Sequence, residues 1–162
     1  MFSPTLISLA TTVLDEARAK GMRITTAESC TGGLIAGLLT EIPGSSDVLE
    51  CGFVAYSDQA KQDLLGIPGN LIAKHGAVSS AVAQAMAQGA AAHSKTQLAV
   101  AVTGIAGPGG GTAQKPVGLV HFAAYREGGA ILHQERRFGD IGRAHVRLKS
   151  VETALTLLRQ LI

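Results

Sequence analysis

Four small polar residues lie between a β-branched segment and a pair of glycines near the N-terminus. They form the stretch "ESCT" at 28–31, after "ITTA" and before "GG". The apolar segment "LIAGLL" that follows favours a helix, so this seam joins a strand to a helix. The first turn of a helix has free N–H groups that can bind an oxyanion. Ser29 or Cys30 is therefore a candidate nucleophile beside an oxyanion site. The structural alternative is that Ser29 or Thr31 only caps the helix.

A base for this nucleophile has to come from elsewhere in the chain, because Ser29 fits neither G-x-S-x-G nor S-x-x-K. The five histidines are scattered, and the better candidate is "AYSDQAK" at 55–61. Tyr56 closes a strand that we expect to be buried, and Lys61 lies one turn into the next helix. A lysine acts as a general base when burial or nearby cations lower its pKa. The alternative is that Lys61 is a solvated lysine on the surface of the helix.

The loop "TGIAGPGGGTAQKP" at 103–116 contains too many glycines for a helix or a strand. We interpret it as a loop shaped for close contact with a ligand, with Thr103 able to donate a hydrogen bond into the site. The alternative is a flexible connection between two strands.

A second candidate for binding an anion is the segment "FGDIGRAHVR" at 138–147. We expect Asp140 to cap the last helix, with Arg143 in its first turn and Arg147 one turn later. A cation at this end opposes the helix dipole, whereas a bound phosphate would offset that cost. The alternative is a surface arginine paired with an acidic side chain.

The hydrophobic periodicity predicts a layered α/β domain with a mixed sheet, since a hairpin at "REGG" joins the last two strands. No repeat or linker divides the chain, which predicts a single domain over 1–162. The helices are expected at 4–20 (capped by Ser3), 32–42, 58–66, 77–94 (capped by Ser79) and in the segment after 140. The strands are expected at 23–27, 48–57, 96–104, 117–126 and 130–138.

Composition excludes several classes of protein. Hydrophobic residues make up 46% of the chain and charged residues 16%, which excludes a disordered chain. No apolar run is long enough to span a membrane, and the N-terminal segment lacks the features of a signal peptide. Two cysteines without metal spacing predict a reduced, cytoplasmic context. A net charge of +2 with 4% aromatic residues disfavours a nucleic-acid partner but leaves room for a small anion.

Taken together, these motifs resemble the CinA C-terminal domain family, whose stand-alone members include nicotinamide-nucleotide amidases. The matching segments are spread over most of the chain in the family's order. They are "AESCTGG" at 27–33, "AYSDQAK" at 55–61, "HGAVS" at 75–79, "VTGIAGPGGGT" with "KPVGLV" between 102 and 120, and "GD…R…VR" at 139–147.

The resemblance implies a three-layer α/β/α sandwich with a mixed sheet, usually dimeric, that hydrolyses the carboxamide of nicotinamide mononucleotide. It implies Ser29 as the nucleophile and Lys61 as its base, with Tyr56 assisting, and neither a metal nor a cofactor. The expected partners are therefore a small nucleotide substrate and a second copy of the chain. The residues expected to contact the substrate are Glu28, Cys30, Thr31, Gly32, Gly33, Thr103, Gly104, Gly107, Gly109, Gly110 and Arg143.

The chain departs from the family pattern at two places. Ser80 stands where the family usually has an acid, and "GDIGR" replaces the common "GDR", which can displace Arg143 by a turn. We also do not expect the N-terminal domain of longer relatives within 162 residues. Two alternatives to an amidase remain: a non-catalytic nucleotide-binding module linked to competence or DNA damage, and, less favoured, a phosphohydrolase. Cys30 remains the rival nucleophile.

Overall fold

Five strands in the order β2-β1-β3-β4-β5 form one mixed sheet in the computed structural model, which describes residues 2–129 and 131–162. β1 pairs in parallel with β2 and β3, β4 is antiparallel to β3, and β5 is antiparallel to β4. The predicted mixed sheet and hairpin are confirmed, although Ala130, the expected start of the last strand, lies outside the described residues. The strands are β1 (Ile24–Glu28), β2 (Leu49–Val54), β3 (Leu98–Gly104), β4 (Leu119–Arg126) and β5 (Ile131–Arg137).

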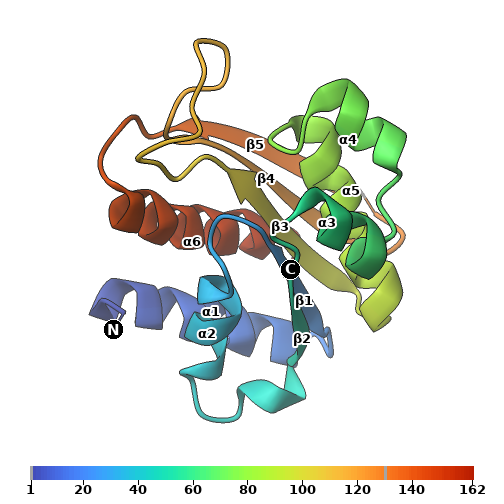
Figure 1. The fold of residues 1–162 in the computed structure, drawn as a ribbon. Coiled ribbons are helices and arrows are strands. Elements are labelled where there is room, and N and C mark those ends of the chain that lie inside the picture. Colours follow the sequence, from blue (N-terminus) through green and yellow to red (C-terminus); the bar gives the residue numbers. More distant parts are fainter. Residues whose placement is uncertain (1, 130) are drawn as a thin grey trace.

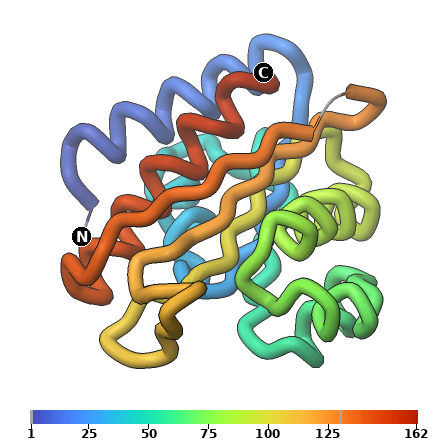
Figure 2. Tube along the Cα trace, turned by 90° about the horizontal axis from the view of Figure 1, so that it is seen from above, coloured from blue at the N-terminus to red at the C-terminus, as the bar shows by residue number. Residues whose placement is uncertain are grey.

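Helices cover both faces of the sheet, which confirms the three-layer sandwich (Figures 1 and 2). Because alternate residues of a strand point to opposite faces, β3 contributes Val100 to one core and Ala101 to the other. The core on the first face includes residues of α1 (Pro4–Ala19), α2 (Leu34–Thr40) and α6 (Arg143–Arg159). The core on the second face includes residues of α3 (Asp58–Leu65), α4 (Gly69–His75) and α5 (Ser80–Ser94).

Three of these helices begin at serine caps, two of which the sequence predicted. The side chains of Ser3, Ser57 and Ser79 accept hydrogen bonds from N–H groups in the first turns of α1, α3 and α5. Pro4 follows Ser3 at the first helical position, where its missing N–H costs nothing. Local sequence therefore fixes where these helices begin.

The second helix is shorter than predicted. Gly32 and Gly33 have φ angles of +61° and +95°, in the left-handed region that glycine tolerates, so α2 begins only at Leu34. Gly33 occupies the cap position, and neither Ser29 nor Thr31 caps the helix. Two elements were not predicted: α4, which follows Pro68, and a short 3₁₀ turn at Ser45–Asp47.

The predicted ends of two other elements were wrong. β2 is an edge strand that alternates between half-buried and exposed residues and ends at Val54, so Tyr56 lies beyond it and is 59% exposed. The cap of α6 is Gly142 rather than Asp140, because Ile141 and Gly142 extend the preceding turn. Arg143 still lies in the first turn, as predicted.

The topology brings several chain segments to one edge of the sheet. β1, β2, β3 and β5 all run in the same direction, so their carboxyl ends lie together. This edge is where open α/β sheets place their ligands. The glycine-rich loop after β3 rises from the same edge in Figure 1. None of the helices in the described part of the chain has both the length and the apolar character needed to cross a membrane.

Candidate active site

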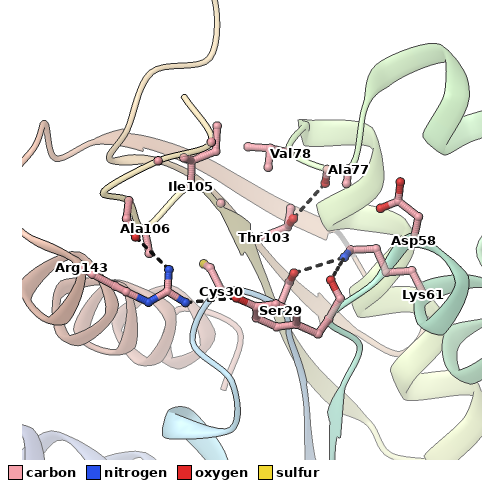
Figure 3. A pocket seen from close by; sticks show the side chains of 15 residues that line it. Ser29, Cys30, Asp58, Lys61, Ala77, Val78, Thr103, Ile105, Ala106 and Arg143 are labelled. Carbon is pink, nitrogen blue, oxygen red and sulfur yellow. Dashed lines mark hydrogen bonds between the residues drawn. The ribbon is translucent and has the colours of Figure 1, made fainter. Parts of the chain in front are cut away.

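A pocket of about 280 Å³ opens at this edge of the sheet (Figure 3). Its walls come from the β1–α2 turn, the start of α3, the α4–α5 connection, the glycine-rich loop and the start of α6. It is lined by ten of the predicted site residues: Ser29, Cys30, Tyr56, Lys61, Thr103, Gly104, Gly107, Gly109, Gly110 and Arg143. Segments far apart in the sequence therefore meet where the motifs predicted a site.

Ser29 is held by the sheet itself. Its N–H donates to the carbonyl of Val102 at 3.0 Å, and the carbonyl of the preceding residue, Glu28, accepts from Ala55 at 2.9 Å. These bonds extend the β1 ladders by one residue on each side. The Ser29 hydroxyl is thereby presented from a rigid backbone, which limits the entropy lost on positioning it for reaction.

Lys61 is the partner of this hydroxyl. Its Nζ lies 3.2 Å from Ser29 Oγ and donates to the main-chain carbonyls of Ala55 (3.1 Å) and Tyr56 (3.2 Å). The side chain is only 1% exposed, so the solvated-lysine alternative was wrong. Burial lowers the pKa of Lys61 below its usual value of 10.5, and the nearby Asp58 carboxylate opposes this shift.

The rival nucleophile Cys30 has a different environment. Its side chain lies in the apolar core of the α1, α2 and α6 face and is 6% exposed. Burial raises the pKa of the Cys30 thiol to about 12. Because the thiolate is the reactive form of cysteine, this environment favours Ser29 as the nucleophile.

Glu28 has a structural role in place of the predicted contact with a substrate. Its fully buried carboxylate accepts hydrogen bonds from the N–H groups of Gly33 (3.1 Å), Ile35 (3.1 Å) and Ala36 (2.9 Å). The carboxylate therefore occupies the helix start that we expected to bind an oxyanion. The other residues of this turn that we expected to contact the substrate do not line the pocket either; they are Thr31, Gly32 and Gly33.

Arg143 connects two walls of the pocket. Its Nη1 donates to the carbonyl of Gly107 at 2.9 Å, and its Nη2 donates to the Tyr56 hydroxyl at 3.1 Å. The "GDIGR" spacing therefore does not remove Arg143 from the site. The Tyr56 hydroxyl pairs with Arg143, whereas Lys61 contacts only the main-chain carbonyl of Tyr56. The expected Tyr56–Lys61 proton relay is thus absent from this arrangement.

The glycine-rich loop is fixed along the pocket by side-chain contacts. Thr103 Oγ1 donates to the carbonyl of Ala77 at 2.9 Å, so this hydroxyl supports the pocket wall and does not point a free proton into the site as expected. Lys115 Nζ donates to the carbonyl of His75 at 2.7 Å and ties the far end of the loop to α4. At Gly104 a Cβ would lie 2.8 Å from the carbonyl oxygen of Leu119, so only glycine fits.

Sequence reasoning missed five residues that line the pocket. All five lie inside the quoted motifs, so the motifs contained the signal without assigning a role to these residues. The missed residues are Asp58, Ala77, Val78, Ile105 and Ala106.

Ser80, which stands where the family usually has an acid, accepts a hydrogen bond from the side chain of Gln84 and lies outside the pocket. Within residues 2–129 and 131–162, no three His, Cys, Asp or Glu side chains are close enough together to bind a metal ion.

Comparison with known proteins shows which family this chain belongs to. The CinA C-terminal domain family matches residues 6–162. A CinA-like protein from Synechococcus sp. (strain RCC307) is 52% identical over 153 residues, which cover 94% of this chain and 36% of that protein. The chain thus spans about a third of the length of the curated relatives it matches.

Solved structures show the same fold. A competence/damage inducible protein from Agrobacterium tumefaciens superposes with a TM-score of 0.97 at 52% identity, over 99% of this chain and 98% of the other. A competence damage-inducible protein from Klebsiella pneumoniae gives a TM-score of 0.91 at 35% identity, over 96% and 95% of the two chains. This chain therefore belongs to the CinA C-terminal domain family.

Proposed function

We propose that the protein is an amidase that hydrolyses the carboxamide of nicotinamide mononucleotide to nicotinic acid mononucleotide and ammonia. The observation that supports this most strongly is the 3.2 Å approach of Lys61 Nζ to Ser29 Oγ at the wall of a pocket. A hydroxyl paired with a buried amine is a recognised way to activate a serine without histidine.

The contacts of Lys61 explain how the amine would act as a base. A neutral amine has two N–H donors and one lone pair. The carbonyls of Ala55 and Tyr56 can only accept, so they take the two donors. The third neighbour is Ser29 Oγ, whose O–H then donates to the lone pair. This arrangement positions the amine to remove the hydroxyl proton as Ser29 attacks.

The reaction then proceeds in two steps. Ser29 Oγ bonds to the carboxamide carbon while its proton passes to Lys61, and the protonated Lys61 returns a proton to the departing ammonia. The resulting ester is cleaved by water in the reverse sequence of proton transfers, which releases the carboxylate and restores the hydroxyl. In each step the carbonyl oxygen gains negative charge, which nearby N–H groups must stabilise.

Charge along the pocket wall supports a nucleotide substrate. Arg143 and Asp58 lie on opposite sides of Ser29 in Figure 3. A nicotinamide nucleotide carries a cationic pyridinium beside its carboxamide and an anionic phosphate farther away. We assign the phosphate to Arg143 and the pyridinium to the side of Asp58, because opposite charges attract most strongly where water is partly excluded. The volume of about 280 Å³ is close to the lower limit for small-molecule sites, about 300 Å³.

The direct test is to incubate the purified protein with nicotinamide mononucleotide and to separate the products by chromatography. We expect nicotinic acid mononucleotide and ammonia in equal amounts. Nicotinamide riboside, which lacks the phosphate, should react at least ~10-fold more slowly, since it loses a charged hydrogen bond worth about 1.5–3 kcal/mol.

A second candidate function is a nucleotide-binding module without catalysis, since the names of the relatives refer to competence and damage induction. This candidate would be favoured if the mononucleotide raised the melting temperature while no deamidated product formed. That result would contradict the amidase.

A further inference from the structure

Arg147 lies one turn after Arg143 on α6 and contacts the backbone directly after Ser29. Its Nε donates to the carbonyl of Cys30 at 3.1 Å, and its Nη2 donates to the carbonyl of Thr31 at 2.9 Å. Arg147 does not line the pocket, whereas Arg143 does. The two arginines therefore act on different parts of the site.

The hydrogen bond from Arg147 to the Cys30 carbonyl determines the direction in which the Thr31 N–H points. The Cys30 carbonyl and the Thr31 N–H belong to one planar trans peptide, so they point in opposite directions. Holding that carbonyl at Arg147 therefore directs the Thr31 N–H away from α6. In the same way, the Ser29 carbonyl accepts from the Gly32 N–H at 3.0 Å, which directs the Cys30 N–H away from that bond.

These two N–H groups are not used elsewhere in the backbone. Within residues 2–129 and 131–162, neither the Cys30 N–H nor the Thr31 N–H donates to another main-chain carbonyl. Glu28 already occupies the N–H groups of Gly33, Ile35 and Ala36. The donors left beside the nucleophile are thus the N–H of Cys30, a residue of the pocket wall, and the N–H of Thr31, which directly follows it in the chain. The residue after the nucleophile is where α/β-hydrolases place one of their two oxyanion donors.

The charge of Arg147 also strengthens these donors. The guanidinium of arginine stays protonated at ordinary pH, so its positive charge polarises the carbonyls that it binds. Polarising the C=O of a peptide makes the N–H of the same peptide a better donor, as in a chain of hydrogen bonds. The Thr31 N–H therefore gains the ability to stabilise negative charge without any contact between Arg147 and a substrate.

We propose that Arg147 is a positioning residue that builds the oxyanion site of this protein by fixing and polarising the Cys30–Thr31 peptide. The inference rests on the proposed function, since it assumes that Ser29 attacks a carbonyl. It differs from the assignment of Arg143 to the substrate, because loss of Arg147 should reduce the rate of the chemical step more than the affinity for the substrate.

The test compares Arg147→Ala and Arg147→Lys with a matched control, Arg126→Ala. Arg126 is a half-buried arginine whose Nη1 donates to the carbonyl of Leu161 at 3.0 Å, at the end of β4 remote from the pocket. The control therefore removes an arginine–carbonyl bond without touching the site. Arg147→Lys retains the cation and the aliphatic stem but cannot bind both carbonyls in a fixed fork.

Two rates are measured for each variant. The first is phosphonylation of Ser29 by a fluorophosphonate, in which Ser29 Oγ bonds to phosphorus, fluoride leaves and Lys61 takes the hydroxyl proton; peptide mass spectrometry locates the label. The second is the turnover of nicotinamide mononucleotide. Removing one oxyanion donor typically costs about 10²–10³ in rate, so weakening the Thr31 N–H should lower both rates at least ~10-fold in Arg147→Ala.

We expect KM to change less than about 3-fold, Arg147→Lys to be intermediate, and added guanidinium at millimolar concentration to restore part of the rate in Arg147→Ala. If both rates in the Arg147 variants match those of Arg126→Ala, the positioning role is wrong while the amidase stands. If the unaltered protein neither reacts with the fluorophosphonate nor turns over the nucleotide, the proposed function fails and the role of Arg147 fails with it.

Discussion

At the scale of single residues, the account depends on a lysine that is neutral enough to accept a proton. Lys61 is buried beside Ser29, and burial lowers its pKa. Replacement by methionine, which keeps the length but removes the base, should lower kcat by about 10²–10⁴ while the protein remains folded. Steady-state kinetics with a thermal melt check this, and a fully active Lys61→Met variant would exclude the lysine as the base.

The pH dependence of kcat/KM follows from the same residue. The rate should rise with pH as Lys61 loses its proton, with a midpoint below 10.5. The Asp58 carboxylate favours the protonated amine and so raises the pKa of Lys61. Asp58→Asn should therefore move the midpoint to lower pH, and a shift to higher pH would show that another group controls this limb.

At the scale of the elements, the β1–α2 seam depends on Glu28. Its carboxylate binds three N–H groups of the seam, and hydrogen bonds to a charged group contribute about 1.5–3 kcal/mol each. Glu28→Ala should lower the free energy of unfolding by about 3 kcal/mol or more, as measured by urea denaturation, with Glu28→Gln losing less. A loss below about 0.5 kcal/mol would show that α2 does not need this cap.

Two histidines on β4 and β5, the strands on the side of the sheet opposite β2, should make the stability of the protein depend on pH. His121 Nδ1 and His133 Nε2 lie 3.0 Å apart on β4 and β5, and burial lowers the pKa of both imidazoles. Because their pKa values are lower in the folded state, the unfolded chain binds protons first as the pH falls. The stabilisation is thus complete above the unfolded value of about 6.5 and is lost below it.

Thermal melts between pH 8 and pH 5 test the role of this pair. The other charged groups that act on His121 are Glu135 and Arg137 on β5 and Lys115 in the glycine-rich loop. His133→Gln should show a smaller fall in melting temperature than the unaltered chain. The exposed His145 on α6 offers the matched control, His145→Gln. Equal falls in all three proteins would assign the pH dependence to other groups.

At the scale of the whole molecule, the sequence predicted the layers, most of the elements and the meeting of Ser29 with Lys61. These followed from hydrophobic periodicity and from motif order, which are properties of the chain. The hydrogen-bond partner of each polar group did not follow. The Tyr56 hydroxyl pairs with Arg143, and Glu28 caps α2, because these choices depend on which side chains the folded edge brings within reach. The sequence also did not predict that β2 lies at the edge of the sheet, because the apolar residues of a strand do not show which strands pair with it.

The expected homodimer stays a prediction that sedimentation can check. The open edge of β2 leaves a row of main-chain donors and acceptors without a neighbouring strand in the sheet, and Val54 on it is 47% exposed. A dimer formed there would extend the sheet across two copies. A charged replacement, Val54→Lys, should then raise the dimer dissociation constant, whereas an unchanged constant would place the interface elsewhere.

The most direct measurement is ammonia release from nicotinamide mononucleotide by the unaltered protein, Ser29→Ala and Cys30→Ala under identical conditions. We expect the unaltered protein and Cys30→Ala to release ammonia at comparable rates, and Ser29→Ala to fall at least ~10³-fold, as removal of a catalytic serine does. Ser29→Ala at the full rate would contradict the account.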